Sequence, residues 1–394
     1  VFGIGFFLSS MHWIVSPFLI YERHLFLSPI SLLFPIFMGL FFSVPTVLIL
    51  IFKKYFNLSL NRLFFLNSLF VALIFFFSEL LRSYLFGGLP FNLIAHIWAY
   101  NSYLIQIVQF IGVFGLSFLT ILWIVFLTFN LHGKNFLAFL SVLIIFPLFL
   151  VSFNFSPKKN RIFSNSEELN IRIVQPNIPQ KRKWEKSSFG KNIESLIELT
   201  VENNNPMEDK VVVWPEVALT LFFNEEYDFQ KFLQKNIPEN ITLITGSLRR
   251  SFSNNDYKVF NSLYIFKDEI LDYYDKKKLV PFGEFIPLRG VLNLFKLAPG
   301  YSDYSRGEKK NEMFFFNNNS KFFFEPSICY EAIFQTSQSK NSNLIINVTN
   351  DAWFGKTTGP RQHLAAQIFR SVEKGAVLVR VANSGISALV NTKG

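Results

Sequence analysis

Long apolar segments dominate the first 156 residues of the chain, and the polar positions between them are few. A helix of about 20 apolar residues spans the hydrocarbon core of a bilayer, so segments of this length indicate membrane-spanning helices. The pattern predicts five such helices, over residues 1–20, 27–52, 63–81, 103–130 and 135–155.

From residue 169 the pattern changes to short runs of apolar and β-branched residues, separated by stretches with helical spacing. Short runs of this kind are typical of buried strands. They predict strands over 171–175, 211–214, 241–246, 262–266, 322–324, 344–348 and 377–381, and helices over 190–203 and 361–373. Strands that alternate with helices predict a layered α/β domain.

Charged residues divide the chain at the same point. Residues 1–156 contain six Lys or Arg and two Asp or Glu. The rest of the chain contains 32 Lys or Arg and 26 Asp or Glu. We therefore predict a multi-span α-helical membrane domain over 1–156 and a soluble domain over 157–394. The formal net charge of +10 does not indicate a nucleic-acid partner, because the basic residues are dispersed among acidic ones instead of forming one stripe.

Lys and Arg in the short loops predict the orientation of the membrane domain. The loop at 53–62 contains three of them, more than any other loop between the predicted helices. Loops enriched in Lys and Arg are typically cytoplasmic. Alternation from this loop places the soluble domain on the opposite, extracytoplasmic side of the membrane.

Cys329 is the only cysteine, so it can form neither an intrachain disulfide nor a thiolate metal site. It follows a run at 321–326 that we interpret as a strand ending at Pro326, and a turn after a strand can present a side chain to a cleft. A lone cysteine is often only a small buried core residue. The polar neighbours Tyr330 and Glu331 argue against that alternative.

Two more polar groups follow predicted strands. Glu216 comes after the strand at 211–214, and three lysines, Lys276 to Lys278, come after the strand at 262–266. Taken singly, the carboxylate could be an acid at a helix N-terminus, and the lysines could be solvated. Taken with the thiol, they supply the base, the cation and the nucleophile that covalent acyl transfer requires. Side chains alternate along an extended backbone, which leaves both Lys276 and Lys278 as candidates for the amine.

These stretches are similar to the Glu-Lys-Cys triad of the nitrilase superfamily, and with five predicted spans ahead of them the chain resembles the apolipoprotein N-acyltransferase family. The resemblance covers nearly the whole chain, and the Pro-Phe-Gly-Glu sequence at 281–284 is its most specific part. The stretches that carry it are 79–82, 86–90, 112–118, 175–180, 183–184, 214–216, 279–287, 329–331, 350–355 and 383–387.

For the fold, the resemblance implies an extracytoplasmic α-β-β-α sandwich of the nitrilase type. For the site, it implies Glu216 as general base, Lys276 as the amine that stabilises the oxyanion, and Cys329 as nucleophile. Lys276 is preferred because it lies eight residues before Glu284, as in the family, whereas Lys278 stands where relatives usually have His. The residues that match supporting or substrate-binding positions of the family are Trp184, Glu284, Tyr330 and Glu331.

For the activity, the resemblance implies transfer of an acyl chain from a phospholipid, through a thioester on Cys329, to the N-terminal amine of diacylglyceryl-cysteine on an apolipoprotein. It implies no cofactor and no metal, and we expect a monomer in the bacterial inner membrane with the catalytic domain on the periplasmic side. The family has eight spans, with the catalytic domain between the last two. We therefore expect this sequence to be part of a longer protein that continues beyond both of its ends.

Two other functions compete with this interpretation. A membrane-anchored amidase of the nitrilase type uses the same triad but resolves the thioester with water. A transporter or membrane scaffold with an inactive extracytoplasmic domain is a second alternative, although the sequence shows no internal repeat of the kind that transporters often have. Analysis of the reaction products separates these functions.

Aromatic residues near the three predicted strand ends indicate an apolar entrance to the site. As a set they predict a mouth that opens toward the bilayer, with Glu284 latching a mobile lid, although each residue could instead pack in the soluble core. The residues concerned are Phe222, Phe223, 282–287, Trp353 and Phe354.

Glu79 and Arg82 lie three residues apart at the outer end of the third predicted span. Charged residues in such segments usually face protein or water. The sequence leaves open whether they form an ion pair at a helix end or take part in function.

Overall fold

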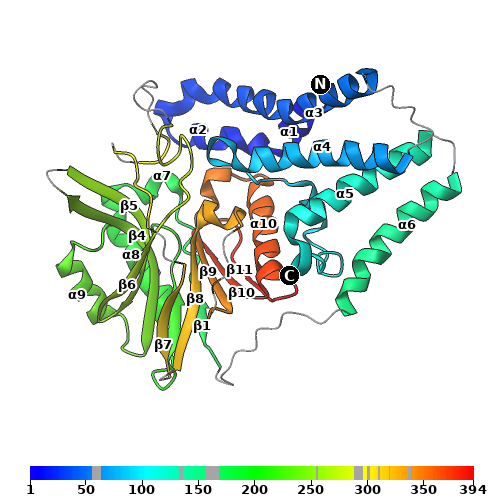
Figure 1. The fold of residues 1–394 in the computed structure, drawn as a ribbon. Helices are drawn as coiled ribbons and strands as arrows, with labels where there is room; N and C mark the ends of the chain where they lie inside the picture. The colour runs from blue at the N-terminus through cyan, green and yellow to red at the C-terminus, as the bar shows by residue number, and fades with distance from the viewer. Residues whose placement is uncertain are drawn as a thin grey trace.

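The computed structural model describes residues 1–55, 64–132, 136–155, 168–253, 256–287, 296–299, 302–308, 311–318, 320–335, 339 and 341–394. Figure 1 shows a helical half, coloured blue to cyan, that lies against an α/β half coloured green to red. The boundary predicted near residue 156 falls outside the described residues, so the limits of the two domains stay a prediction.

The helices of the first half are α1 (Phe2–Ser10), α2 (Ser16–Ile20), α3 (Leu33–Tyr55), α4 (Phe64–Tyr84), α5 (Val108–His132) and α6 (Phe136–Ser152). Within the described part of the chain, three stretches are long and apolar enough to cross a membrane, namely Glu22–Tyr55, Leu66–Tyr84 and Val108–Asn130. The first predicted span is a broken helix, because α1 and the helix at His12–Ile20 are bent by 65°. α6 is shorter, with 17 residues. The count of five spans stays a prediction.

Membrane helix α5 is tied to the α/β half at its start. Gly112 has φ 68° and ψ 175°, a conformation that favours glycine, and it separates a first short turn from the main body of α5. The next residue, Val113, donates its N–H to Glu373 Oε1 at 2.6 Å. Glu373 belongs to α10 of the other half, so a carboxylate of the α/β half caps the body of a membrane helix.

Two β-sheets form the centre of the α/β half. The first has the order β1-β2-β4-β5-β6, with β3 pairing with β4, and the second has the order β11-β10-β9-β8-β7. The first sheet consists of β1 (Ile171–Ile173), β2 (Lys210–Val213), β3 (Leu219–Phe222), β4 (Ile241–Ser253), β5 (Asp256–Lys267) and β6 (Glu269–Asp275). The second consists of β7 (Met313–Asn317), β8 (Ser320–Ile328), β9 (Leu344–Thr349), β10 (Val377–Ala382) and β11 (Ala388–Val390).

Alternating side chains along the strands build the layers. In β2, Val211 and Val213 pack against the second sheet, whereas Val212 packs on the other face. The helices are α7 (Gln180–Lys183), α8 (Lys186–Val201), α9 (Tyr227–Asn236) and α10 (Gly359–Lys374). α8 and α9 cover the outer face of the first sheet, and α10 covers the outer face of the second. This arrangement confirms the predicted α-β-β-α sandwich.

All seven predicted strands are present, and elements such as β3, β6, β7, α7 and α9 have no counterpart among the predicted ones. The prediction that one strand ends at Pro326 is wrong, because β8 continues to Ile328. β7 pairs with β8 only as far as Phe324, so the proline lies beyond that pairing. Because no β7 residue pairs with the proline, its missing N–H costs no hydrogen bond to β7.

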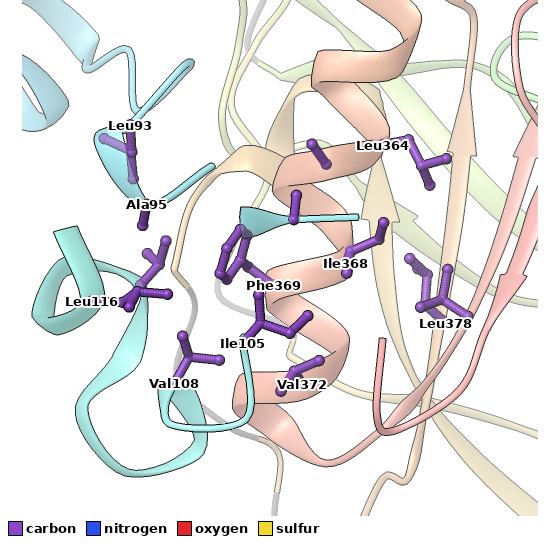
Figure 2. Packing of buried hydrophobic residues seen from close by; sticks show 14 of the residues in the cluster. Leu93, Ala95, Ile105, Val108, Leu116, Leu364, Ile368, Phe369, Val372 and Leu378 are labelled. Carbon is purple, nitrogen blue, oxygen red and sulfur yellow. The ribbon is translucent and has the colours of Figure 1, made fainter. Parts of the chain in front are cut away.

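Helix α10 joins the two halves of the molecule. Figure 2 shows its apolar side chains Ile368, Phe369 and Val372 packed between Leu378 of β10 and residues of the helical half such as Ile105. Nearly every residue of α10 is buried, because the helix has a sheet on one side and the helical half on the other. The α/β half therefore shares one continuous apolar core with the helical half.

Candidate active site

Three strand ends meet at one edge of the sandwich. Glu216 lies three residues after the end of β2, Lys276 directly follows β6, and Cys329 directly follows β8. The strand that delivers Lys276 is β6, which the sequence did not predict; the predicted strand at 262–266 is part of β5. The structure thus brings together the three residues expected to form a triad.

Lys276 is held between two carboxylates. Its Nζ lies 3.3 Å from Glu216 Oε1 and 2.8 Å from Glu284 Oε1, and its side chain is 1% exposed. Asn261 donates its Nδ2–H to the same two oxygens, at 2.9 and 3.1 Å. Lys278 is exposed instead, with its Nζ 5.3 Å from the centre of the Phe334 ring. Of the two candidate lysines, only Lys276 therefore contacts Glu216.

The charges around the thiol keep it protonated. Burial and the Glu216 carboxylate raise the pKa of Cys329 to about 12, although Lys276 opposes them. Burial would lower the pKa of Lys276, but Glu284 and Glu216 together hold it well above its usual value. The site therefore holds a neutral thiol and a permanent ammonium at neutral pH. Attack by sulfur requires a base that takes the proton as the new bond forms.

Glu331 fixes the Cys329 turn and the lysine turn to each other. Its Oε2 accepts the Ile328 N–H at 2.8 Å, and its Oε1 accepts the N–H groups of Lys277 and Lys278 at 2.7 and 3.1 Å. Cys329 itself has φ 49°, a left-handed conformation that costs a non-glycine residue free energy. Because the buried Glu331 carboxylate binds both turns, it supports this conformation beside Lys276.

Tyr330 and Trp184 border the site from two sides. Tyr330 donates its hydroxyl to the carbonyl of Gly88, in the helical half, at 2.6 Å. Trp184 is half-buried against a small apolar cluster that includes Val217 and Leu279, the neighbours of the catalytic turns. All four residues expected to support the site therefore lie around the triad.

Glu79 and Arg82 hold the loop that carries Gly88. Arg82 Nη1 donates to the carbonyls of Leu89 and Phe91, both at 2.8 Å. Glu79 Oε1 accepts the Ile94 N–H at 2.7 Å. The two side chains thus organise the loop at the end of α4.

Sequence reasoning gave no role to two polar residues of the site, Lys183 and Asn261, although Lys183 lies in a stretch that resembles the family. The Lys183 Nζ donates to the backbone carbonyl of Glu216 at 2.8 Å, and burial lowers the pKa of Lys183 to about 8 although Glu216 and Cys329 oppose this. In the sequence, Lys183 is the last residue of a Lys-Arg-Lys run that suggests a solvated surface. Asn261 gave a clearer signal, because it interrupts an apolar run in β5.

A second buried ionic cluster lies behind the nucleophile. Arg380 Nη2 is 2.5 Å from Asp351 Oδ2, and His363 Nδ1 is 3.0 Å from Asp351 Oδ1. The other ring nitrogen of His363, Nε2, lies 3.2 Å from the backbone carbonyl of Cys329. Burial opposes ionisation of Asp351, but Arg380 and His363 hold its pKa below the usual value. None of these three residues was singled out from the sequence.

The residues expected to form an apolar mouth divide into three groups. Phe282 is 45% exposed, as the prediction requires. Phe223 is fully buried between the first sheet and α9, so its assignment to the mouth is wrong. Phe354 packs edge-on against Trp13 of the helical half, with ring centres 4.7 Å apart. Glu284, expected to latch a lid, pairs with Lys276 inside the site.

Known proteins with similar sequences cover both halves of the chain. Residues 1–127 match the family described as Apolipoprotein N-acyltransferase N-terminal domain, and residues 170–394 match the family described as Carbon-nitrogen hydrolase. A protein named Apolipoprotein N-acyltransferase from Rickettsia prowazekii is 32% identical over 411 residues, covering 100% of this chain and 78% of its own. The chain belongs to the apolipoprotein N-acyltransferase family. It is therefore an acyltransferase associated with a membrane, and this favours acyl transfer over the amidase and transporter alternatives.

Further relatives agree with the family assignment. The Apolipoprotein N-acyltransferase of Brucella suis is 32% identical over 411 residues, covering 100% of this chain and 75% of its own. Among solved structures, XC1258 from Xanthomonas campestris, a CN-hydrolase superfamily protein, aligns with a TM-score of 0.36 and 16% identity over 58% of this chain and 84% of its own. That similarity is too low to add to the assignment. Within the described residues, no cluster of three or more His, Cys, Asp or Glu side chains could hold a metal ion.

Proposed function

We propose that this acyltransferase takes an acyl chain from a phospholipid onto Cys329 and passes it to the N-terminal amine of diacylglyceryl-cysteine on an apolipoprotein. The observation that carries the proposal is the Lys276 ammonium held between Glu216 and Glu284 beside a protonated thiol. The site also lies where the helical half contacts the catalytic half, through Tyr330 and Gly88. Both substrates carry acyl chains that stay in the membrane, so a site at this contact suits them.

In the first half-reaction, Glu216 takes the thiol proton while the sulfur of Cys329 attacks the ester carbonyl carbon. The carbonyl oxygen becomes an oxyanion, and the Lys276 ammonium donates a hydrogen bond to it, a contact worth about 3–4 kcal/mol in related sites. When the ester C–O bond breaks, the proton on Glu216 passes to the leaving lysophospholipid oxygen. A thioester on Cys329 remains.

In the second half-reaction, the neutral amine of the acceptor attacks the thioester carbonyl carbon. Glu216 takes a proton from the attacking nitrogen, and Lys276 again stabilises the oxyanion. When the C–S bond breaks, the proton returns to sulfur and an amide is released. Because its pKa is raised, Lys276 stays charged through both half-reactions.

We also propose a monomer in a bacterial inner membrane, with residues 1–156 in the membrane and 157–394 on the periplasmic side. The relatives are bacterial proteins, which supports the compartment. Lys53 and Lys54 at the end of α3 support the orientation, since they fall in the loop with the most Lys and Arg. The loop itself lies mostly outside the described residues.

The test is the intact mass of the protein after incubation with a phospholipid of defined acyl chains. We expect a mass increase of one acyl group, which disappears when a diacylated lipopeptide is added and reappears on that peptide. A Cys329→Ala variant, as the control, should gain no acyl group. Release of free fatty acid in place of an acylated lipopeptide would show hydrolysis and contradict the proposal.

A further inference from the structure

A pocket of about 160 Å³ lies beside the active site, where the two halves of the molecule meet. Its walls come from the end of α4, the loop around Gly87, the start of the body of α5 and four segments of the catalytic half. Typical pockets for whole small molecules have volumes of about 300–1,000 Å³. The pocket therefore suits one polar end of a larger molecule.

Among the described residues, three cations line this pocket, namely Lys278, Arg306 and Arg370, and no Asp or Glu does. Arg370 is 5% exposed, and its Nε is buried without a hydrogen-bond acceptor in the described part of the chain. The carboxylate nearest to it is Glu373, whose Oε2 lies 2.9 Å from Arg370 Nη1 while its Oε1 is occupied by the Val113 N–H. Arg370 is thus paired with one carboxylate, which lies outside the pocket wall.

The two exposed cations also lack carboxylate partners among the residues described. Lys278 Nζ lies 5.3 Å from the centre of the Phe334 ring, and the Arg306 guanidinium lies 5.6 Å from the centre of the Phe285 ring. Aromatic faces hold these cations in place without neutralising them. Arginine and lysine together, arranged without acidic neighbours, are the side chains that bind phosphate groups.

Much of the remaining wall is apolar, and it comes from both halves. Leu93 and Phe114 belong to the helical half and Ile333 to the catalytic half, beside a few polar side chains such as Gln335. The ends of α4 and α5, both of which are long enough to cross a bilayer, border the pocket. A phosphate that carries an apolar glycerolipid fits such a wall better than a free phosphate ion does. The N-terminus of the acyl acceptor is a cation when protonated, and the three cations of the pocket repel it.

Two residues that line the pocket also follow the catalytic turns closely along the chain. Lys278 lies two residues after Lys276, and Phe334 lies five residues after Cys329. In a phospholipid only the glycerol backbone separates the phosphate from the ester carbonyl. We propose that this pocket binds the phosphate of the phospholipid acyl donor and so places its ester at the thiol of Cys329. This inference rests on the proposed function. It gives Lys278, which stands where relatives usually have His, a role in binding the acyl donor.

The experiment measures how fast Cys329 of the full chain, in detergent micelles, is acylated by phosphatidylglycerol and by a diacylglycerol with the same acyl chains. The variants are Lys278→Gln, Arg306→Gln and the double variant, because both side chains are exposed and their loss should not unfold the protein. The matched control is Lys231→Gln, an exposed lysine on α9 far from the pocket.

We expect the wild-type protein to be acylated faster by phosphatidylglycerol than by diacylglycerol. In the double variant the ratio of these two rates should fall at least about tenfold, since each charge-assisted contact to phosphate contributes about a factor of ten. Acylation by diacylglycerol and alkylation of Cys329 by iodoacetamide should stay within about twofold in all variants, which separates donor binding from damage to the site. The Lys231→Gln control should behave as wild type.

Three results would overturn the inference. The first is equal use of both donors by the wild-type protein, and the second is an unchanged preference in the double variant. The third is inhibition by inorganic phosphate of acylation from both donors alike, which would mean that the pocket holds free phosphate. The absence of an acyl adduct from either donor would instead refute the proposed function, so the two failures are distinguishable.

Discussion

Two buried ionic clusters lie on either side of Cys329, and they differ in how their charges are matched. The closed cluster pairs Asp351 with Arg380 and adds His363, which reaches the backbone carbonyl of Cys329. The reactive cluster shares one ammonium, that of Lys276, between Glu216 and a second carboxylate. The closed cluster contacts the backbone of the nucleophile, whereas the reactive cluster sets the charge around its sulfur.

The difference shows how one site combines rigidity with reactivity. A buried ion pair matched one to one is costly to break but offers no group that can change its protonation easily. In a cluster where two carboxylates contact the same ammonium, a carboxylate oxygen can take a proton and return it. The comparison therefore predicts that substitutions in the reactive cluster change catalysis, while substitutions in the closed cluster change stability.

The largest effect is expected for Cys329→Ser, which removes the nucleophile that both clusters serve. A hydroxyl is far less nucleophilic than a thiol at neutral pH, while its volume is similar, so acyl transfer should be abolished and the fold retained. The measurements are lipopeptide acylation and the thermal unfolding midpoint. Near-normal acyl transfer by the serine variant would exclude a covalent mechanism.

Glu216→Gln should separate the two roles of the carboxylate, as base and as negative charge. Acyl transfer should fall by about 10²–10⁴-fold, because an amide cannot take the thiol proton. The Glu216 carboxylate raises the pKa of Cys329, which lies at about 12, so its removal lowers that pKa. The pH profile of alkylation by iodoacetamide, which needs the thiolate, should therefore shift to lower pH.

The control for this substitution is Glu194→Gln, an exposed carboxylate on α8. It should leave both acyl transfer and the alkylation profile unchanged. If Glu216→Gln acylates its cysteine at the normal rate, Glu216 is not the base. If the alkylation profile does not move, the carboxylate does not act on the thiol through its charge.

Lys276→Met should lower acyl transfer by about 10²–10³-fold, the typical effect of removing one donor to an oxyanion. Lys277→Met is the matched control, because the Lys277 ammonium points away to Asn311, at 2.9 Å. Rates of thioester formation from a soluble short-chain ester measure both variants. A loss with Lys278→Met in that assay, without loss in Lys276→Met, would reverse the assignment of the catalytic amine.

Asp351→Asn should act mainly on stability. The substitution leaves the buried Arg380 charge without its carboxylate, a change that costs about 3–5 kcal/mol of unfolding free energy. Thermal unfolding of the purified protein measures this loss, with the exposed Asp228→Asn on α9 as control. The molecules that remain folded should keep acyl transfer within about tenfold, since one conservative change near a backbone contact leaves the triad in place.

If folded Asp351→Asn protein instead lost acyl transfer as completely as Glu216→Gln does, the distinction between the two clusters would fail. His363→Gln is the milder companion variant, because glutamine can still donate to the Cys329 carbonyl. It should unfold at a temperature between those of wild type and Asp351→Asn.

The residues of the triad were predicted from the sequence, but less of the structure that supports them was. Glu216 and Cys329 follow strands with strong apolar signals, so their place at strand ends was predictable. The strand before Lys276 was not, because β6 alternates exposed and buried positions in a polar stretch. Asp351, His363 and Arg380 come from three separate elements, and no spacing along the chain shows that they meet.

Helix α10 illustrates a different limit. Its sequence predicted a helix but not its neighbours. The polar residues Gln367, Arg370 and Lys374 are the kind that normally mark a solvent-exposed face, whereas all three are buried here. The contact between Phe369 and the helical half joins residues more than 250 positions apart. Only the folded chain shows that the catalytic half and the membrane half share this core.

The smallest effect is expected for Phe282→Ser, which tests whether lipid access depends on the surface outside both clusters. Phe282 is 45% exposed and has φ 60°, and its turn is closed by a hydrogen bond from its N–H to the Phe285 carbonyl at 2.7 Å. This geometry presents an aromatic ring to the outside of the turn that follows Lys276. Serine keeps the backbone but removes the apolar surface, so acylation by long-chain phospholipid should fall by about three- to tenfold.

Acylation by a short-chain soluble ester and alkylation by iodoacetamide should not change in Phe282→Ser, because neither needs a contact with the bilayer. Phe285→Ser is the contrasting variant: its half-buried ring packs with the cluster around Leu279, so it should also lower the thermal midpoint. A parallel loss of all three reactions in Phe282→Ser would mean that the ring supports the Lys276 turn. No loss at all would mean that lipid enters elsewhere, and the mouth would then be sought at the cationic pocket between α4 and the catalytic half.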